Sequence, residues 1–237
     1  MAAATQLPLN LGLRDEASFA NYLAGPNREA LHAVEALVHG EHRFLYLWGT
    51  TGSGKTHLLH AACQAVSAVG ARCAYLPLNE LRTLGTDVLE GLEQLALVCV
   101  DDVQSIATRP EWETELFHLY NRLRETGAIL LAAGDAPPSA LGLSLPDLSS
   151  RLAWGLVLQL QPLNDAEKIS ALQLRARNRG LELPAEVGSY LLRHWPRDMP
   201  RLFELLQRLD THSLTRQRKL TIPLVRELIA HETAQAG

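Results

Sequence analysis

The sequence contains few cysteines, and their arrangement excludes two common kinds of small scaffold. Only Cys63, Cys73 and Cys99 occur in 237 residues, and no two of them form a Cys-x-x-Cys pair. An odd set of cysteines without such a pair argues against a disulfide framework and against a structural zinc site. We therefore expect a reducing compartment and predict a cytoplasmic protein.

Long apolar runs and an excess of positive charge are also missing. The longest apolar stretches, such as Leu95 to Val100, are far too short to span a bilayer, and the first residues show no secretion signal. We therefore expect no membrane partner. The 22 Lys and Arg residues are outnumbered by 26 Asp and Glu residues, for a formal net charge of −4. Indiscriminate binding to nucleic acid through a cationic surface is thus not expected, and contact with DNA would need a local patch or a partner.

What the sequence does contain is enough apolar material, 47% of the residues, for one or two domains. Up to residue 163, short apolar runs alternate with helical patterns, which is typical of a parallel sheet covered by helices. The strands expected from these runs are Phe44–Trp48, Cys73–Leu76, Leu97–Val100, Ile129–Ala133 and Leu156–Leu160. From residue 164 onward only amphipathic helices are expected. They run over about 165–179, 184–194 and 199–214, with a last one from about Pro223.

Charge changes at the same point in the chain. Residues 1–163 carry 10 basic and 17 acidic side chains, whereas residues 164–237 carry 12 and 9. We therefore predict three parts, namely a flexible tail over 1–13, an α/β nucleotide-binding domain over 14–163 and a small all-α domain over 164–237.

The strongest chemical signal is a glycine-rich loop between an expected strand and an expected helix. It reads Gly49, Thr50, Thr51, Gly52, Ser53, Gly54, Lys55 and Thr56. Glycines let successive backbone N–H groups point at a phosphate, and the following helix adds its positive dipole end. Lys55 is expected to neutralise phosphate oxygens, and the Thr56 hydroxyl to ligate Mg²⁺. The loop predicts a nucleoside phosphate with magnesium.

Acidic residues follow two of the expected strands. Asp101 and Asp102 come directly after a buried run, where two neighbouring acids are costly unless they face a cation. We expect Asp101 to support the magnesium ion, partly through water, and Asp102 to orient an attacking water. Asp135 follows another strand and is placed to sense a terminal phosphate or the water, because ligands of open α/β sheets sit at the carboxyl ends of strands. The alternative for Asp135 is an ordinary turn residue.

These motifs together resemble the AAA+ ATPases, and within them the DnaA-related group that holds the replication initiator DnaA and the family of DnaA regulatory inactivators. The similarity covers nearly the whole chain. The matching segments are Phe19 to Ala30, Gly54 to Ala62, Val100 to Gln104, Pro146 to Gly155 and Arg197 to Phe203. The resemblance implies an AAA+ P-loop module followed by a helical lid, with ADP or ATP as the bound nucleotide.

The resemblance also implies roles for particular residues. Tyr22 and Asn27 would border the adenine, and His57 would lie beside the nucleotide without ligating a metal. Arg151 would act as an arginine finger that reaches a neighbour's ATP, the alternative being a surface ion pair with Asp147. In the lid, Arg201 would touch the phosphates of the chain's own nucleotide, although Pro200 alters the helix start expected there.

The first residues of the chain resemble the short peptide with which replication proteins dock on the β sliding clamp of DNA polymerase III. Its expected contacts are Gln6, Leu7, Leu9 and Leu11, with Pro8 keeping the backbone extended. Gln and Leu are common residues, so the alternative is a tail without a partner. Neither an amino-terminal interaction domain nor a DNA-reading helix-turn-helix is expected.

The function that the resemblance implies is negative regulation of replication initiation. The chain would bind the DNA-loaded clamp, contact DNA only through it, and stimulate hydrolysis of ATP held by DnaA, with weak ATPase activity of its own and a possible homo-oligomer. One alternative is a self-sufficient AAA+ ATPase or helicase-loader-like protein, although Asp stands where many such enzymes carry Glu. A second is a structural adaptor whose nucleotide only holds the lid closed.

Overall fold

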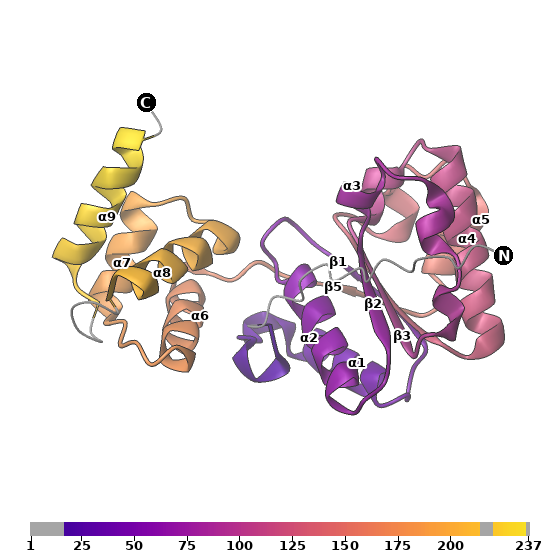
Figure 1. The fold of residues 1–237 in the computed structure, drawn as a ribbon, viewed down its shortest axis with the longest axis horizontal. Coiled ribbons are helices and arrows are strands. Elements are labelled where there is room, and N and C mark those ends of the chain that lie inside the picture. The colour runs from indigo at the N-terminus through magenta and orange to yellow at the C-terminus, as the bar shows by residue number, and fades with distance from the viewer. Residues whose placement is uncertain (1–16, 214–219, 236–237) are drawn as a thin grey trace, which may run out of the picture.

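The computed structural model describes residues 17–213 and 220–235, with side chains over 17–210 and 220–229. The expected clamp peptide, Gln6 to Leu11, lies outside the described residues. Within them the chain forms a sheet covered by helices, followed by a group of helices with its own core (Figure 1). No helix in the described ranges is both long and apolar enough to cross a membrane.

Five parallel strands form one sheet in the order β2-β3-β4-β1-β5. The strands are β1 (Phe44–Trp48), β2 (Cys73–Pro77), β3 (Leu97–Asp101), β4 (Ile129–Gly134) and β5 (Leu156–Gln159). All five were expected from their apolar runs, and the ends differ from the expected ones by a single residue at most. Trp48 pairs with Gly134 and Pro77 with Asp101, so the carboxyl ends of four strands meet at one edge. The glycine-rich loop and the acidic residues follow at that edge.

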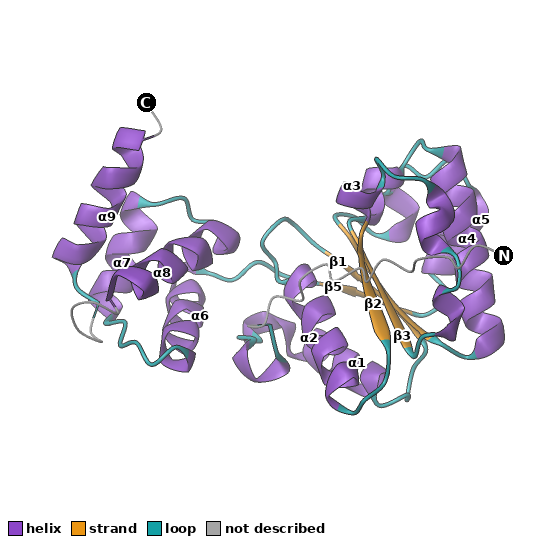
Figure 2. Ribbon diagram, viewed as in Figure 1, coloured by secondary structure: helices purple, strands orange, loops and turns teal. Residues whose placement is uncertain are grey.

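Helices cover both faces of this sheet, because successive strand residues point to opposite sides. On one face Leu131 and Ala133 pack with α1 (Arg28–Val38) and α2 (Lys55–Ala68). On the other, Leu130 and Ala132 pack with a core to which three further helices contribute. These are α3 (Leu78–Leu81), α4 (Pro110–Thr126) and α5 (Pro146–Leu152). Figure 2 shows the strands between the two helical layers.

Short 3-10 helices connect these elements. They are η1 (Phe19–Asn21), η2 (Gly25–Asn27), η3 (Thr86–Leu89), η4 (Leu92–Gln94), η5 (Val103–Ile106) and η6 (Pro138–Ala140). Asn27 in η2 lies 3% exposed and binds the backbone of Gln161 in both directions. Its amide nitrogen donates to the Gln161 carbonyl at 2.9 Å, and its oxygen accepts from the Gln161 N–H at 2.7 Å. This pair of bonds fixes the segment before α1 to the segment after β5.

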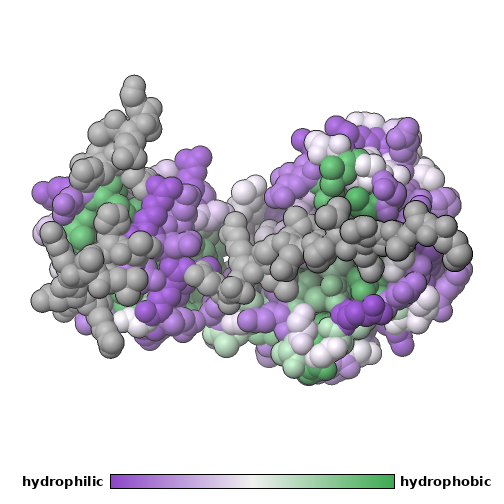
Figure 3. Space-filling view, in the orientation of Figure 1, coloured by the Kyte–Doolittle hydropathy of each residue, from purple (hydrophilic) through white to green (hydrophobic). Residues whose placement is uncertain are grey.

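The helices after β5 form the small bundle that the sequence predicts. They are α6 (Asp165–Asn178), α7 (Ala185–His194), α8 (Met199–Ser213) and α9 (Ile222–Gln235). Asn164 caps α6 in a reciprocal capping box with Glu167, which satisfies backbone groups that a helix start leaves open. Leucines from all four helices share one buried core. In the space-filling view, hydrophilic and hydrophobic side chains both reach the surface on each part of the molecule (Figure 3).

Candidate nucleotide-binding site

The loop Gly49–Thr56 wraps around the end of β1 in a conformation that only glycines allow at three positions. Gly52 and Gly54 have φ angles of 80° and 103°, in the left-handed region. A Cβ on Gly49 would collide with the carbonyl oxygen of Leu160, and one on Gly54 would lie 2.9 Å from the ring of Tyr22. The glycines expected from the motif are thus required by the backbone itself.

Lys55 lies under this loop and is 8% exposed. Its Nζ donates to the carbonyl oxygens of Gly49 at 2.6 Å and Thr50 at 3.1 Å. Burial lowers the pKa of the ammonium group, while the nearby carboxylates of Asp101, Asp102 and Asp135 act in the opposite direction. The Lys55 amine thus lies at the base of the loop, bound to two of its carbonyl groups.

Asp101 is the buried acid of the site, with 1% exposure. The hydroxyl groups of Thr56 and Tyr75 donate to its Oδ2 at 2.7 and 2.9 Å, and the Asp102 N–H donates to its Oδ1 at 3.0 Å. Burial raises the pKa of Asp101, and these hydrogen bonds oppose the rise. The Thr56 hydroxyl and the Asp101 carboxylate, both expected as magnesium ligands, are thus in direct contact.

Asp102 and Asp135 are connected through Gln104, the last residue of the matching segment Val100 to Gln104. Gln104 donates from Nε2 to Asp102 Oδ1 at 3.0 Å and accepts the Asp135 N–H on Oε1 at 3.2 Å. Asp102 has a φ angle of 57°, which is uncommon for a residue with a side chain. This conformation turns the chain after β3, and Asp102 lines the cavity described next.

A cavity of about 250 Å³ opens above the loop, between the sheet and the lid helices. The loop side contributes Thr51, Gly52, Gly54, Lys55 and Thr56, and the lid side contributes Arg175, Met199, Pro200 and Phe203. His57, His60 and Asp102 complete the described wall together with Ala17. A smaller and more apolar cavity adjoins it, lined by Tyr22, Leu23, Leu163, Ala171, Met199 and Phe203 among others. A charged floor beside an apolar niche is the arrangement that a nucleotide needs.

His57 lies between the two cavities and is kept neutral. Its Nε2 lies 3.0 Å from the Ser18 carbonyl, and its ring packs on Tyr22 with centroids 5.3 Å apart. Burial lowers the His57 pKa to about 4; the hydrogen bond with the Ser18 carbonyl opposes this shift, and the proximity of Arg175 and His60 adds to it. Burial likewise raises the Tyr22 pKa to about 12.

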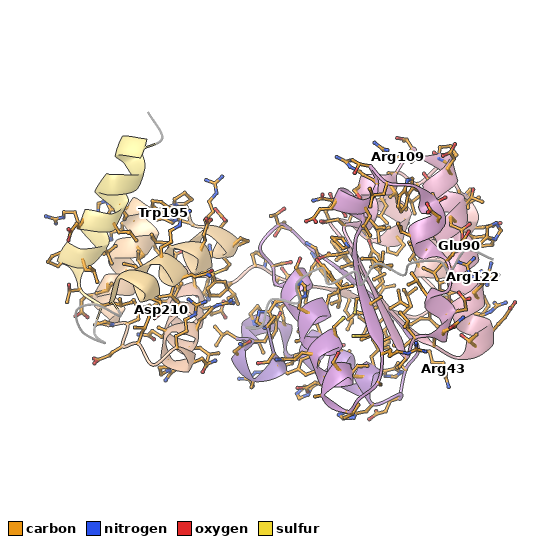
Figure 4. The ribbon with its side chains drawn as sticks, in the orientation of Figure 1. Arg43, Glu90, Arg109, Arg122, Trp195 and Asp210 are labelled. Atoms are coloured by element: carbon orange, nitrogen blue, oxygen red, sulfur yellow. The ribbon has the colours of Figure 1, made fainter. Side chains whose placement is uncertain are left out.

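The lid cation that faces the cavity is Arg175, whereas the sequence pointed to Arg201. Arg175 lies on α6 with its guanidinium 4.4 Å from the ring centre of Phe203, and both side chains line the cavity. Arg201 has a side chain 64% exposed that pairs with Asp198 at 3.7 Å, and it is not part of the described lining. Its carbonyl accepts from the indole of Trp195, labelled in Figure 4. The phosphate role of Arg201 therefore stays a prediction without a supporting contact.

Arg151 lies on α5, away from this cavity. Its guanidinium lies over the ring of Trp154 at 4.9 Å and is 6.0 Å from the ring centres of Phe117 and Tyr120. Within the described residues no carboxylate pairs with it, so the alternative bond to Asp147 is not found. Arg122 on α4, labelled in Figure 4, shows the contrast because it pairs with Glu93 and Glu115.

Family models match both parts of the chain. The model described as "Bacterial DnaA ATPase domain" matches residues 13–159, and the model described as "Hda, lid domain" matches residues 165–229. The first covers more than half of the sequence and includes the glycine-rich loop, Asp101 and Arg151. The second covers the helices that carry Arg175 and Arg201.

Solved structures of the initiator are similar over most of the chain. Domain III of DnaA from Thermotoga maritima is 26% identical with a TM-score of 0.76, and the match covers 92% of this chain and 97% of that one. AMPPCP-bound DnaA from Aquifex aeolicus is 25% identical with a TM-score of 0.69, over 84% of this chain and 66% of that one. A replication initiator DnaA bound to AMPPCP and single-stranded DNA matches with the same values.

Proposed function

Because the chain belongs to the bacterial DnaA ATPase domain family of AAA+ proteins and has an Hda-like lid, we propose that it is a negative regulator of replication initiation acting on DnaA. In this proposal it docks on the DNA-loaded β sliding clamp and stimulates hydrolysis of the ATP that DnaA holds. The product is ADP-bound, inactive DnaA.

The chain's own cavity is proposed to hold ADP or ATP, since related DnaA structures contain the ATP analogue AMPPCP. Lys55, the N–H groups of the loop and Arg175 supply positive charge for the phosphates. The apolar cavity beside Tyr22 and Phe203 suits a purine base. Asn27 would act on that base indirectly, because its amide is engaged by Gln161.

The same residues fit a magnesium ion. The Thr56 hydroxyl and the Asp101 carboxylate are oxygen donors 2.7 Å apart, and Mg²⁺ prefers such ligands together with phosphates and water. When bound, the ion would shield phosphate charge. Lys55 and the loop would hold the phosphates in register, while Asp102 would be available to orient water.

The observation that supports action on a partner is the position of Arg151. Its cation lies on an aromatic surface outside the chain's own cavity, without a carboxylate among the described residues to neutralise it. A planar cation in this state suits the triphosphate of a neighbouring molecule, where such fingers accelerate hydrolysis by roughly 10³- to 10⁵-fold.

Changing Arg151 to Ala tests this proposal. Hydrolysis of ATP preloaded on DnaA, measured with clamp and DNA present, should fall at least about 100-fold if the guanidinium stabilises the transferring phosphoryl group. Arg109→Ala, which removes an exposed arginine near α4, is the matched control and should leave the rate unchanged. Undiminished hydrolysis with Arg151→Ala would remove the finger role.

A second candidate function is hydrolysis by the chain itself. The contacts that favour it are the Thr56–Asp101 bond and the Asp102–Gln104–Asp135 connection beside the cavity, because together they resemble a complete hydrolytic site. Steady turnover by the isolated chain, abolished by Lys55→Ala, would favour this candidate. Turnover that depends on DnaA and Arg151 would favour the first.

A further inference from the structure

Trp154 is a large aromatic residue that the fold leaves 65% exposed. It stands in the short turn between α5 and β5, and the chain has only four tryptophans. Single exposed apolar residues are common on protein surfaces, so what distinguishes this ring is the side chains around it.

Two cations share this ring. The guanidinium carbons of Arg151 and Arg124 lie 4.9 and 5.7 Å from its centre, within the range of a cation–π interaction. An aromatic face attracts a guanidinium without neutralising its charge, whereas a carboxylate would compete with a phosphate for the same hydrogen-bond donors. Arg151 is therefore restrained and still able to bind an anion.

The backbone at Trp154 is held in place by its neighbours. The Trp154 N–H donates to the Arg151 carbonyl at 3.1 Å, which ties the two residues into one turn. The next residue, Gly155, lies against the carbonyl of Phe44, where no Cβ would fit. On the other side Leu148 and Leu152 anchor α5 in the core. The backbone of Trp154 is thus fixed beside that of Arg151, and the ring reaches the guanidinium from this point.

We propose that Trp154 is a positioning residue for Arg151, holding the guanidinium in the direction in which it meets a partner's nucleoside triphosphate. The inference rests on the proposed function. The pair of arginines on one ring gives this surface a positive charge, which the phosphates of such a nucleotide complement. The aromatic face, rather than apolar bulk alone, is the property that matters.

Three variants separate these properties. Trp154→Phe keeps an aromatic face, Trp154→Leu keeps apolar bulk, and Trp154→Ala keeps neither. In the DnaA-dependent hydrolysis assay we expect Phe to stay within about twofold of the wild type and Leu and Ala to lower the maximal rate about fivefold or more. The chain concentration at half-maximal rate should not change, because positioning alters the reaction after docking. Leu84→Ala, at a side chain 55% exposed elsewhere in the sheet domain, is the control and should act as wild type.

The outcomes distinguish this inference from the function on which it rests. If all three Trp154 variants support hydrolysis at the wild-type rate while Arg151→Ala is strongly impaired, only the positioning role is overturned. A raised half-maximal concentration with an unchanged maximal rate would also overturn it, since Trp154 would then be a docking contact. If ATP bound to DnaA is hydrolysed at the wild-type rate in the presence of Arg151→Ala, both the proposed function and the positioning role are overturned. Equal melting temperatures and ADP affinities for all variants show that folding and the chain's own site are intact.

Discussion

Single arginines of this chain carry the same charge but face different neighbours. Arg122 is held between two glutamates, and Arg201 pairs with Asp198 at the surface. Arg175 lies on Phe203 in the wall of the cavity, and Arg151 lies on Trp154 outside it. Since an aromatic ring does not neutralise a guanidinium as a carboxylate does, Arg151 is suited to a phosphate outside the chain's own cavity, whereas Arg175 is suited to one by its place in the cavity wall.

At this scale the first prediction concerns Arg175. Arg175→Ala should weaken ADP binding about 10- to 100-fold, the effect of losing a charged hydrogen-bond partner. Binding of adenosine, which has no phosphate, should be unchanged. Isothermal titration of both ligands measures the difference, and Arg201→Ala is the matched control, expected to stay near wild type because its guanidinium is engaged outside the described cavity wall.

The opposite ranking would support the phosphate role that the sequence predicts for Arg201. If Arg201→Ala weakened ADP binding and Arg175→Ala did not, the lid would contact the phosphates through α8 in the bound state. Lys55→Ala serves as the positive control, because loss of ADP affinity there shows that the cavity is the nucleotide site.

The site residues that could be predicted from the sequence are those that lie close together along the chain. Lys55 and Thr56 belong to one contiguous motif, and Asp101 directly follows a recognisable strand. Tyr75 reaches Asp101 from a neighbouring strand with no motif to mark it, and Gln104 closes the matching segment Val100 to Gln104 without any sign there that it would bind Asp102. Arg175 was overlooked because its place in the cavity depends on how α6 packs, which a linear pattern does not record.

At the scale of elements, the strands were predictable because buried parallel strands are continuous apolar runs. The strand ends were harder to predict. Asp101 and Gly134 are the last residues of β3 and β4, although they lie outside the apolar runs. A helix end is easier to place where glycine stops it, as Gly127 does after α4 with a φ angle of 77°. The bonds between η2 and the segment after β5 could not be foreseen, because 134 residues separate Asn27 from Gln161.

Those bonds give the prediction at this scale. Asn27→Ala removes both contacts to Gln161 and should lower the free energy of unfolding by about 2 kcal/mol, because polar groups of the backbone lose their partners. Urea unfolding followed by circular dichroism measures it. Asn178→Ala, at an exposed position on α6, should change stability by less than about 0.5 kcal/mol. An unchanged midpoint for Asn27→Ala would mean that water replaces the two bonds at no cost.

At the scale of the whole molecule, we propose that two nucleotides occupy two separate places. One belongs to the cavity between the sheet and the lid, and the other belongs to a partner that meets Arg151 on α5. Figure 1 shows α5 at the right and the lid helices α6 to α9 at the left, with the sheet between them. Variants of one site should therefore leave the other intact.

The tail gives a prediction that does not depend on either site. Changing Gln6 and Leu9 to Ala should abolish clamp binding in surface plasmon resonance while ADP affinity stays the same, because a short docking peptide relies on a few anchoring side chains. DnaA-dependent hydrolysis should then lose its stimulation by clamp and DNA, since tethering raises local concentration. Full clamp affinity in the variant would show that the docking peptide lies elsewhere.

The most direct test of the central claim asks whose ATP is cleaved. DnaA is loaded with ATP carrying one phosphorus label and this chain with ATP carrying another, and the two are mixed with clamp and DNA for a single turnover. The account predicts rapid release of phosphate from the nucleotide of DnaA and little release from that of the chain. Rapid release of the chain's own phosphate, with the ATP of DnaA left intact, would contradict it.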